Sequence, residues 1–285
     1  MPSIFKSLLV TLLVFAVSVN KAQAVNIAIL DTGLNPGILG PFIEPGGFDF
    51  VNNDNDPSDE SSNLHGTAVG DVAVRSGTNV TLTAIKTYQE ADGTTNQIMA
   101  DGFNYTATLG NVRVVNYSGA SLTNTPLSAL LANTNAGKIV VLQAGNFGGP
   151  RPAGDAGKAA LLGGLGIVAG GSNAGGTDIQ PFSNRAGDLK DHFIMAPTNA
   201  IITSSDGTSM STPRVSAAAA TLLNNYGFLS PNQVVSILFE SAKDLGAPGA
   251  DEIYGHGVLD LNAAMSAVGS GEIPSEGGDS LSLIH

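Results

Sequence analysis

One serine of this chain stands where a helix is expected to begin. Ser209 lies in the stretch GTSMSTP at residues 207–213, and apolar and small residues follow at helical spacing from Val215. Pro213 lacks a backbone N–H, which a helix tolerates in its first turn, so we expect Ser209 close to the helix N-terminus. Free N–H groups and the helix dipole favour developing negative charge there. Such a serine can act as a nucleophile, although most serines before helices are N-caps.

A serine nucleophile needs a base and an acid, and two residues are candidates. Asp31 follows 25–30, an almost continuous apolar run typical of a buried parallel strand, and should face the crevice where α/β proteins bind ligands. His65 opens a predicted helix after a long polar loop, where its imidazole can titrate. Taken alone, Asp31 would more often be a turn former and His65 a surface residue. Asn146 follows another apolar run and offers a side-chain amide to an oxyanion.

The elements that must position these residues alternate along the chain. Apolar runs predict strands at 25–30, 80–88, 112–117, 138–143 and 165–170, with short extended pieces at 193–197 and 200–203. Helical patterns start at 65, 96, 127, 209, 231 and 258. This alternation predicts an α/β fold, a doubly wound, mostly parallel sheet with helices on both faces. Such a sheet would bring Asp31, His65 and Ser209 to one rim.

Four short stretches resemble the subtilisin-like serine peptidases, or subtilases. They are AILDTG at 28–33, HGT at 65–67, AGN at 144–146 and GTSMSTP at 207–213, in family order. The resemblance runs from about Val25 to Val268. It implies that Ser209 attacks the scissile carbonyl of a polypeptide, that His65 acts as general base and then acid, and that Asp31 orients the imidazole.

The same resemblance implies further site residues. Asn146 and the backbone N–H of Ser209 would form the oxyanion hole. An extended substrate would lie between two edge strands. The implied substrate-binding residues are Asp92, Gly93, Thr94, Tyr117, Ser118 and Gly119.

The loop ahead of His65 carries oxygen-bearing side chains at short alternating spacing. A hard cation such as Ca²⁺ requires such ligands, but the spacing is not that of an EF-hand, so a solvated polar loop is the alternative. The pattern Asp-Phe-Val-x-Asn-Asp resembles the calcium loop of some subtilases. It implies a structural Ca²⁺, with no cofactor needed for the chemistry. The implied ligands are Asp49, Asn52, Asp54, Asp56 and Ser58.

The N-terminus has the pattern of a secretory signal peptide. Lys6 precedes the apolar run Ser7–Val19, which is shorter than the roughly 20 residues of a membrane span. Ala22-Gln23-Ala24 forms a small-x-small cleavage site. We therefore expect cleavage near Ala24, secretion to an extracellular or periplasmic location, and no stable membrane anchor. The expected organisation is a signal peptide at 1–24, a peptidase domain at 25–268 and a flexible Gly/Ser/acidic tail at 269–285.

Composition limits the partners. With 285 residues and 42% hydrophobic content, the chain can bury a sizeable core. The net charge is −12, and loss of Lys6 and Lys21 with the signal peptide would make it −14, which argues against a nucleic-acid partner. There is no cysteine, so packing and bound metal would have to stabilise a secreted product.

Two other interpretations remain open at this stage. The related sedolisin type shares the Gly-Thr-Ser signature but uses a glutamate where subtilisins use histidine, and His65 argues against it. The second is a catalytically silent homologue that serves as a binding or assembly module. Many secreted subtilases carry a large inhibitory propeptide ahead of the strand with Asp31, but here that strand follows the predicted cleavage site at once. The chain would then fold unaided, use a separate folding helper or inhibitor, or be a partial gene product.

Overall fold

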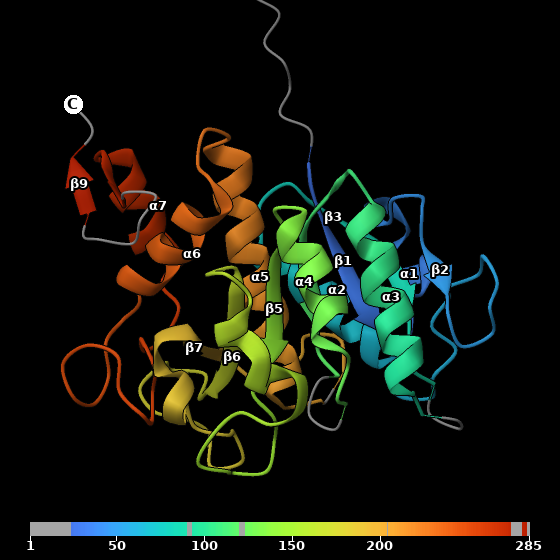
Figure 1. Ribbon diagram of the computed structural model, residues 1–285, viewed down its shortest axis with the longest axis horizontal. Coiled ribbons are helices and arrows are strands. Elements are labelled where there is room, and N and C mark those ends of the chain that lie inside the picture. Colours follow the sequence, from blue (N-terminus) through green and yellow to red (C-terminus); the bar gives the residue numbers. More distant parts are fainter. Residues whose placement is uncertain (1–23, 90–92, 120–122, 204, 275–280, 284–285) are drawn as a thin grey trace, which may run out of the picture.

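Seven parallel strands form the central sheet of the computed structural model (Figure 1). The structure describes residues 24–89, 93–119, 123–203, 205–274 and 281–283. The strands are β1 (Val25–Asp31), β2 (Phe48–Asp49), β3 (Val80–Lys86), β4 (Val112–Tyr117), β5 (Ile139–Gln143), β6 (Gly166–Ser172) and β7 (Phe193–Pro197). Every residue of β1, β5 and β6 is buried, as expected of parallel strands covered on both faces.

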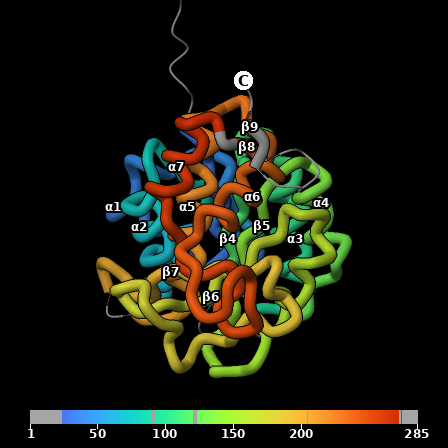
Figure 2. The backbone as a smooth tube through the Cα atoms, turned by 90° about the vertical axis from the view of Figure 1, so that its left-hand side faces the viewer, coloured from blue at the N-terminus to red at the C-terminus, as the bar shows by residue number. Residues whose placement is uncertain are grey.

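Helices cover both faces of the sheet. They are α1 (Pro36–Leu39), α2 (His65–Ser76), α3 (Asn96–Thr108), α4 (Leu127–Asn135), α5 (Thr208–Asn225), α6 (Pro231–Glu240) and α7 (Leu261–Gly269). Short 3₁₀ helices lie at Gly40–Phe42, Gly154–Leu161 and Gly187–His192. Apolar residues of α2, α5, α6 and α7 pack in one core cluster, and those of α3 and α4 pack in a second. Figure 2 shows α2 and α5 on one side of the sheet and α3 and α4 on the other.

The strand order creates a crevice beside β1. The order is β2-β3-β1-β4-β5-β6-β7, so the chain adds β3 on one side of β1 and then β4 on the other. In open α/β sheets, ligands bind outside the carboxyl ends of the strands at such a reversal. The carboxyl ends of β1 and β4 are Asp31 and Tyr117, and both come from predicted site stretches.

The predicted fold class is confirmed, with local differences. The helix expected from Val258 begins at Leu261, because the side chain of Asp260 caps it by accepting a hydrogen bond from the N–H of Ala263 over 2.9 Å. Val258 instead exchanges two backbone hydrogen bonds with Lys243. The extended piece expected at 200–203 is not a strand among the residues described there.

The expected tail at 269–285 contains regular structure. Strands β8 (Glu272–Pro274) and β9 (Leu281–Leu283) pair antiparallel, and Ile273 is buried in the core cluster of α6 and α7. The burial of Ile273 holds the described part of β8 against this cluster, in a segment whose average composition suggested flexibility. No helix among the described residues is long and apolar enough to cross a membrane. Of the predicted signal peptide at 1–24, residues 1–23 lie outside the described residues.

Candidate active site

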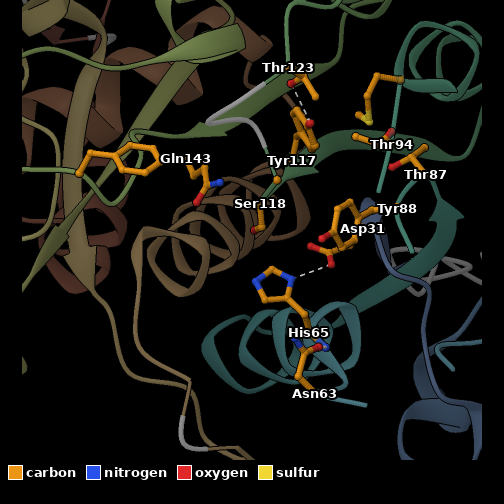
Figure 3. A pocket seen from close by; sticks show the side chains of 13 residues that line it. Asp31, Asn63, His65, Thr87, Tyr88, Thr94, Tyr117, Ser118, Thr123 and Gln143 are labelled. Carbon is orange, nitrogen blue, oxygen red and sulfur yellow. Dashed lines mark hydrogen bonds and ion pairs between the residues drawn. The ribbon is translucent and has the colours of Figure 1, made fainter. Parts of the chain in front are cut away.

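Asp31 and His65 meet where β1 ends and α2 begins. The Nδ1 of His65 lies 2.7 Å from the Oδ1 of Asp31, and Figure 3 shows the two side chains facing each other. The backbone N–H of Thr32 donates to the same Asp31 oxygen over 2.8 Å, and the N–H of Gly66 donates to the Thr32 hydroxyl over 2.9 Å. These bonds join the end of β1 to the first turn of α2. The structure thus brings Asp31 and His65 together, as the sequence predicted.

The charges around His65 favour the imidazolium form. The carboxylate of Asp31 is the main cause that raises the pKa of His65, against the opposing effect of burial. Asp59 adds a smaller contribution of the same sign. Asp59 is buried and fixed, because one of its oxygens accepts hydrogen bonds from the N–H and the hydroxyl of Thr67 at 2.9 and 2.7 Å. Sequence reasoning missed Asp59, which lies in the same loop, directly after the predicted calcium ligand Ser58.

Ser209 is the second residue of α5 and is 8% exposed. Its expected place near the helix N-terminus is therefore observed. The premise about Pro213 was wrong, because α5 begins at Thr208 and Pro213 lies beyond its first turn, inside the helix. The hydroxyl of Ser118 donates to the backbone carbonyl of Ser209 over 2.9 Å, which ties α5 to the end of β4.

Asn146 presents its amide nitrogen close to Ser209. Its Oδ1 accepts hydrogen bonds from the N–H and the hydroxyl of Thr208 at 2.8 and 2.9 Å, which directs the Nδ2 group elsewhere. A methyl group built onto Gly207 would lie 3.3 Å from both the Nδ2 of Asn146 and the Oγ of Ser209. The two groups thus border the same small space, as an oxyanion-hole donor and a nucleophile must.

A cleft of about 370 Å³ opens beside Asp31 and His65 (Figure 3). Of the predicted substrate-binding residues, Thr94, Tyr117, Ser118 and Gly119 line it. Gly93 lies next to it and pairs with the backbone of Gln89, and Asp92 is outside the described residues. The lining residues that sequence reasoning missed are Asn63, Thr87, Tyr88, Met99, Thr123, Gln143 and Phe147. Asn63, Gln143 and Phe147 lie within three residues of a recognised motif, and that proximity was the available signal.

Comparisons with known proteins agree with this geometry. The sequence profile described as "Subtilase family" matches residues 22–257. Subtilisin DY of Bacillus licheniformis is 30% identical over 263 residues, which cover 86% of this chain and 92% of that protein. The chain belongs to the subtilase family.

Two further relatives extend the comparison. Thermitase of Thermoactinomyces vulgaris is 31% identical over 147 residues, covering 46% of this chain and 51% of thermitase. A solved lanthipeptide protease shares the fold with a TM-score of 0.70 at 22% identity, over 86% of this chain and 87% of its own. Family membership makes the protein a subtilisin-type serine peptidase with polypeptide substrates, and it decides against the sedolisin alternative.

One wall of the cleft in this subtilase is fixed by a buried network. The hydroxyl of Tyr117 lies 2.9 Å from that of Thr123, which in turn donates to Asp155 over 2.6 Å. Asp155 is fully buried, and Thr125 and Lys158 satisfy its remaining acceptor positions. Burial raises the pKa of Tyr117, so its phenol stays neutral and keeps donating or accepting a hydrogen bond.

The loop predicted to bind calcium is organised around an internal cation. Asp49 is fully buried, and its Oδ2 lies 2.9 Å from the ammonium of Lys86, which is 2% exposed. The amide of Asn52 donates to the same oxygen over 3.0 Å, and the N–H groups of Val51 and Asn52 donate to Oδ1. Burial opposes the charge of Lys86, but Asp49 and Glu60 outweigh it and raise the pKa of the ammonium.

Three of the other predicted calcium ligands are joined by local hydrogen bonds within the loop, where Asp56 donates its N–H to Asp54 Oδ1 over 2.9 Å. Asp54 and Asp56 are exposed, and the Oδ1 of Asp56 accepts hydrogen bonds from the N–H and the hydroxyl of Ser58. Among the described residues, no three or more histidines, cysteines or carboxylates gather as a metal site. In this arrangement, the donors around Asp49 do not fit a calcium ion.

Proposed function

We propose that this subtilase is a secreted serine endopeptidase that uses Asp31, His65 and Ser209 as its catalytic triad. The observation that carries the proposal is the 2.7 Å contact between His65 Nδ1 and Asp31 Oδ1. The hydroxyl of Ser118 supports the placement, because Ser118 lines the cleft with His65 and bonds to the backbone of Ser209.

The residue chemistry gives each group one role. The Oγ of Ser209 attacks the scissile carbonyl while the Nε2 of His65 takes its proton, and Asp31 stabilises the resulting imidazolium. The Nδ2 of Asn146 and the N–H of Ser209 donate to the oxyanion of the tetrahedral intermediate. The imidazolium then protonates the leaving amine, which frees the C-terminal product and leaves an acyl-enzyme. Water, deprotonated by His65, hydrolyses this ester and restores the serine.

Casein hydrolysis by the wild type and by Ser209→Ala tests this function. The wild type should degrade casein at neutral pH, and the variant should be inactive with an unchanged thermal unfolding midpoint. A well-folded wild type without hydrolytic activity would instead favour the catalytically silent homologue, which serves as a binding or assembly module.

Secretion is the second part of the proposal. The support is the charged, apolar and small-residue pattern of residues 1–24. Expression with this segment should place a product that starts at Val25 outside the cytoplasm, as N-terminal sequencing can show. A product that keeps Met1 in the cytoplasmic fraction would contradict it.

Calcium binding by residues 49–58 stays a prediction. It requires Asp49 to give up donors that now surround it, including Lys86. If the ion binds, EGTA should lower the midpoint of thermal unfolding by several degrees and Ca²⁺ should restore it. An unchanged midpoint would show that the ammonium of Lys86 stabilises this loop without calcium.

A further inference from the structure

Helix α5 has a gap in its hydrogen bonding at the nucleophile. In a regular α-helix, the carbonyl of residue 209 accepts a hydrogen bond from the N–H of residue 213. Residue 213 is Pro213, which has no N–H and whose ring crowds the carbonyl four residues before it. The Ser209 carbonyl therefore lacks this partner within its own helix.

A hydroxyl from the end of β4 fills the gap. Ser118 Oγ donates to the Ser209 carbonyl oxygen over 2.9 Å. Ser118 is 2% exposed, so water hardly competes for this bond. A buried carbonyl without a partner is costly, and the bond from Ser118 removes that cost.

Two further side chains determine where the Ser118 proton points. The Nδ2 of Asn116 donates to Ser118 Oγ over 3.0 Å, and the hydroxyl of Ser216 donates to Asn116 Oδ1 over 2.9 Å. Because the Ser118 oxygen accepts from Asn116, its own proton is directed to the Ser209 carbonyl. Asn116 and Ser216 are fully buried. The chain of donors thus runs from the middle of α5 through β4 and back to the start of α5.

We propose that Ser216, Asn116 and Ser118 are positioning residues that hold the nucleophile through its backbone carbonyl. The proposal rests on the proposed function of Ser209. The carbonyl carbon and the Cβ of Ser209 share one Cα, so fixing the carbonyl fixes the direction of the Cα–Cβ bond from which Oγ extends. Small displacements of a reacting atom lower the rate of the chemical step. Because the hydroxyl of Ser118 bonds to α5, it is the backbone of Ser118 that is available to contact the substrate.

A double-mutant cycle between Ser118 and Pro213 tests the proposal. Ser118→Ala should lower kcat about tenfold and change KM less than about twofold, because one hydrogen bond to the nucleophile's backbone is lost. Pro213→Ala supplies the missing N–H. In that background, the same Ser118→Ala change should lower kcat less than about twofold.

Three further variants keep the test independent of Pro213. Asn116→Asp replaces the donor Nδ2 by an acceptor, which draws the Ser118 proton away from Ser209, so kcat should fall at least as far as in Ser118→Ala. Ser216→Ala should give a smaller loss in kcat, because it removes only the most distant bond. Ser118→Thr keeps the hydroxyl and should retain most of kcat.

The outcomes separate this inference from the proposed function. Equal fold losses from Ser118→Ala in both backgrounds, or a loss confined to KM, would overturn the positioning role. An inactive wild type would count against the proposed function alone. In that case the contacts are tested by thermal unfolding of the four proteins of the double-mutant cycle: wild type, Ser118→Ala, Pro213→Ala and the double variant. Pro213→Ala should cancel most of the shift in unfolding midpoint caused by Ser118→Ala. Additive shifts would overturn the proposal.

Discussion

The carboxylate of Asp31 is held asymmetrically. Its Oδ1 accepts from Thr32 and contacts His65, whereas its Oδ2 is buried without a hydrogen-bond partner among the described residues. A buried acceptor without a donor is rare and costly in folded proteins. The contact through Oδ1 places the negative charge of Asp31 beside the imidazole, which raises the pKa of His65.

The pH dependence of activity belongs to this residue scale. A general base must be neutral, and Asp31 raises the pKa of His65 above its ordinary value of 6.5. The acid limb of kcat/KM should therefore have its midpoint above 6.5 and move to lower pH in Asp59→Asn, which removes one raising charge. If the midpoint of the acid limb is the same in Asp59→Asn as in the wild type, the carboxylate of Asp59 does not act on His65.

Asn146 gives a second prediction at the same scale. Loss of one oxyanion-hole donor in subtilisin lowers kcat about 10²–10³-fold, and we expect a loss of that order for Asn146→Ala. Since the Oδ1 of Asn146 also holds Thr208, Asn146→Asp is the matched variant that keeps this acceptor and lacks the amide donor. Steady-state kinetics should show low kcat in both. Full activity of Asn146→Asp would exclude the donor role.

At the scale of elements, the close approach of α2 to the end of β1 sets the distance between His65 and Asp31. A Cβ at Gly66 would lie 2.3 Å from the carbonyl oxygen of Gly33 and 3.1 Å from the Cβ of Asp31. Only glycine permits this approach, which explains the glycine beside His65 in the HGT stretch.

Gly66→Ala should push α2 away from β1. We expect a large loss of kcat/KM together with a lower thermal unfolding midpoint, because the displaced atoms are backbone and cannot rotate away. Gly110→Ala is the control, since a Cβ there meets nothing within 4 Å. Similar behaviour of the two variants would contradict the role of the close approach.

The elements were largely predictable, and their long-range pairings were not. Apolar runs located β1, β5 and β6, because parallel strands covered on both faces are mostly apolar. Four short motifs located Asp31, His65, Asn146 and Ser209. Sequence patterns gave no sign that Lys86 would meet Asp49 across the β2–β3 pair, because that contact depends on strand register. The bond from Ser118 to Ser209 was missed for the same kind of reason, since it joins residues 91 positions apart.

At the scale of the whole molecule, the buried ion pair between Lys86 and Asp49 joins the long loop to the sheet. Removing one partner of such a pair costs about 3–5 kcal/mol, because the other charge stays buried alone. Lys86→Met should therefore lower the free energy of unfolding in urea by about that amount. Arg151→Met is the control, since the side chains of Arg151 and of its ion-pair partner Asp188 are both exposed. This pair should contribute at most about 1 kcal/mol to stability. Equal small effects would contradict a structural role for Lys86.

Covalent labelling of the nucleophile tests the central claim most directly. Wild type, Ser209→Ala and His65→Ala are treated with an organofluorophosphonate at neutral pH, and the modified peptide is located by mass spectrometry. The wild type should carry one adduct at Ser209, Ser209→Ala should carry none, and His65→Ala should react far more slowly because its serine has lost the base. A folded wild type that stays unlabelled, or an adduct that persists in Ser209→Ala, would contradict the account.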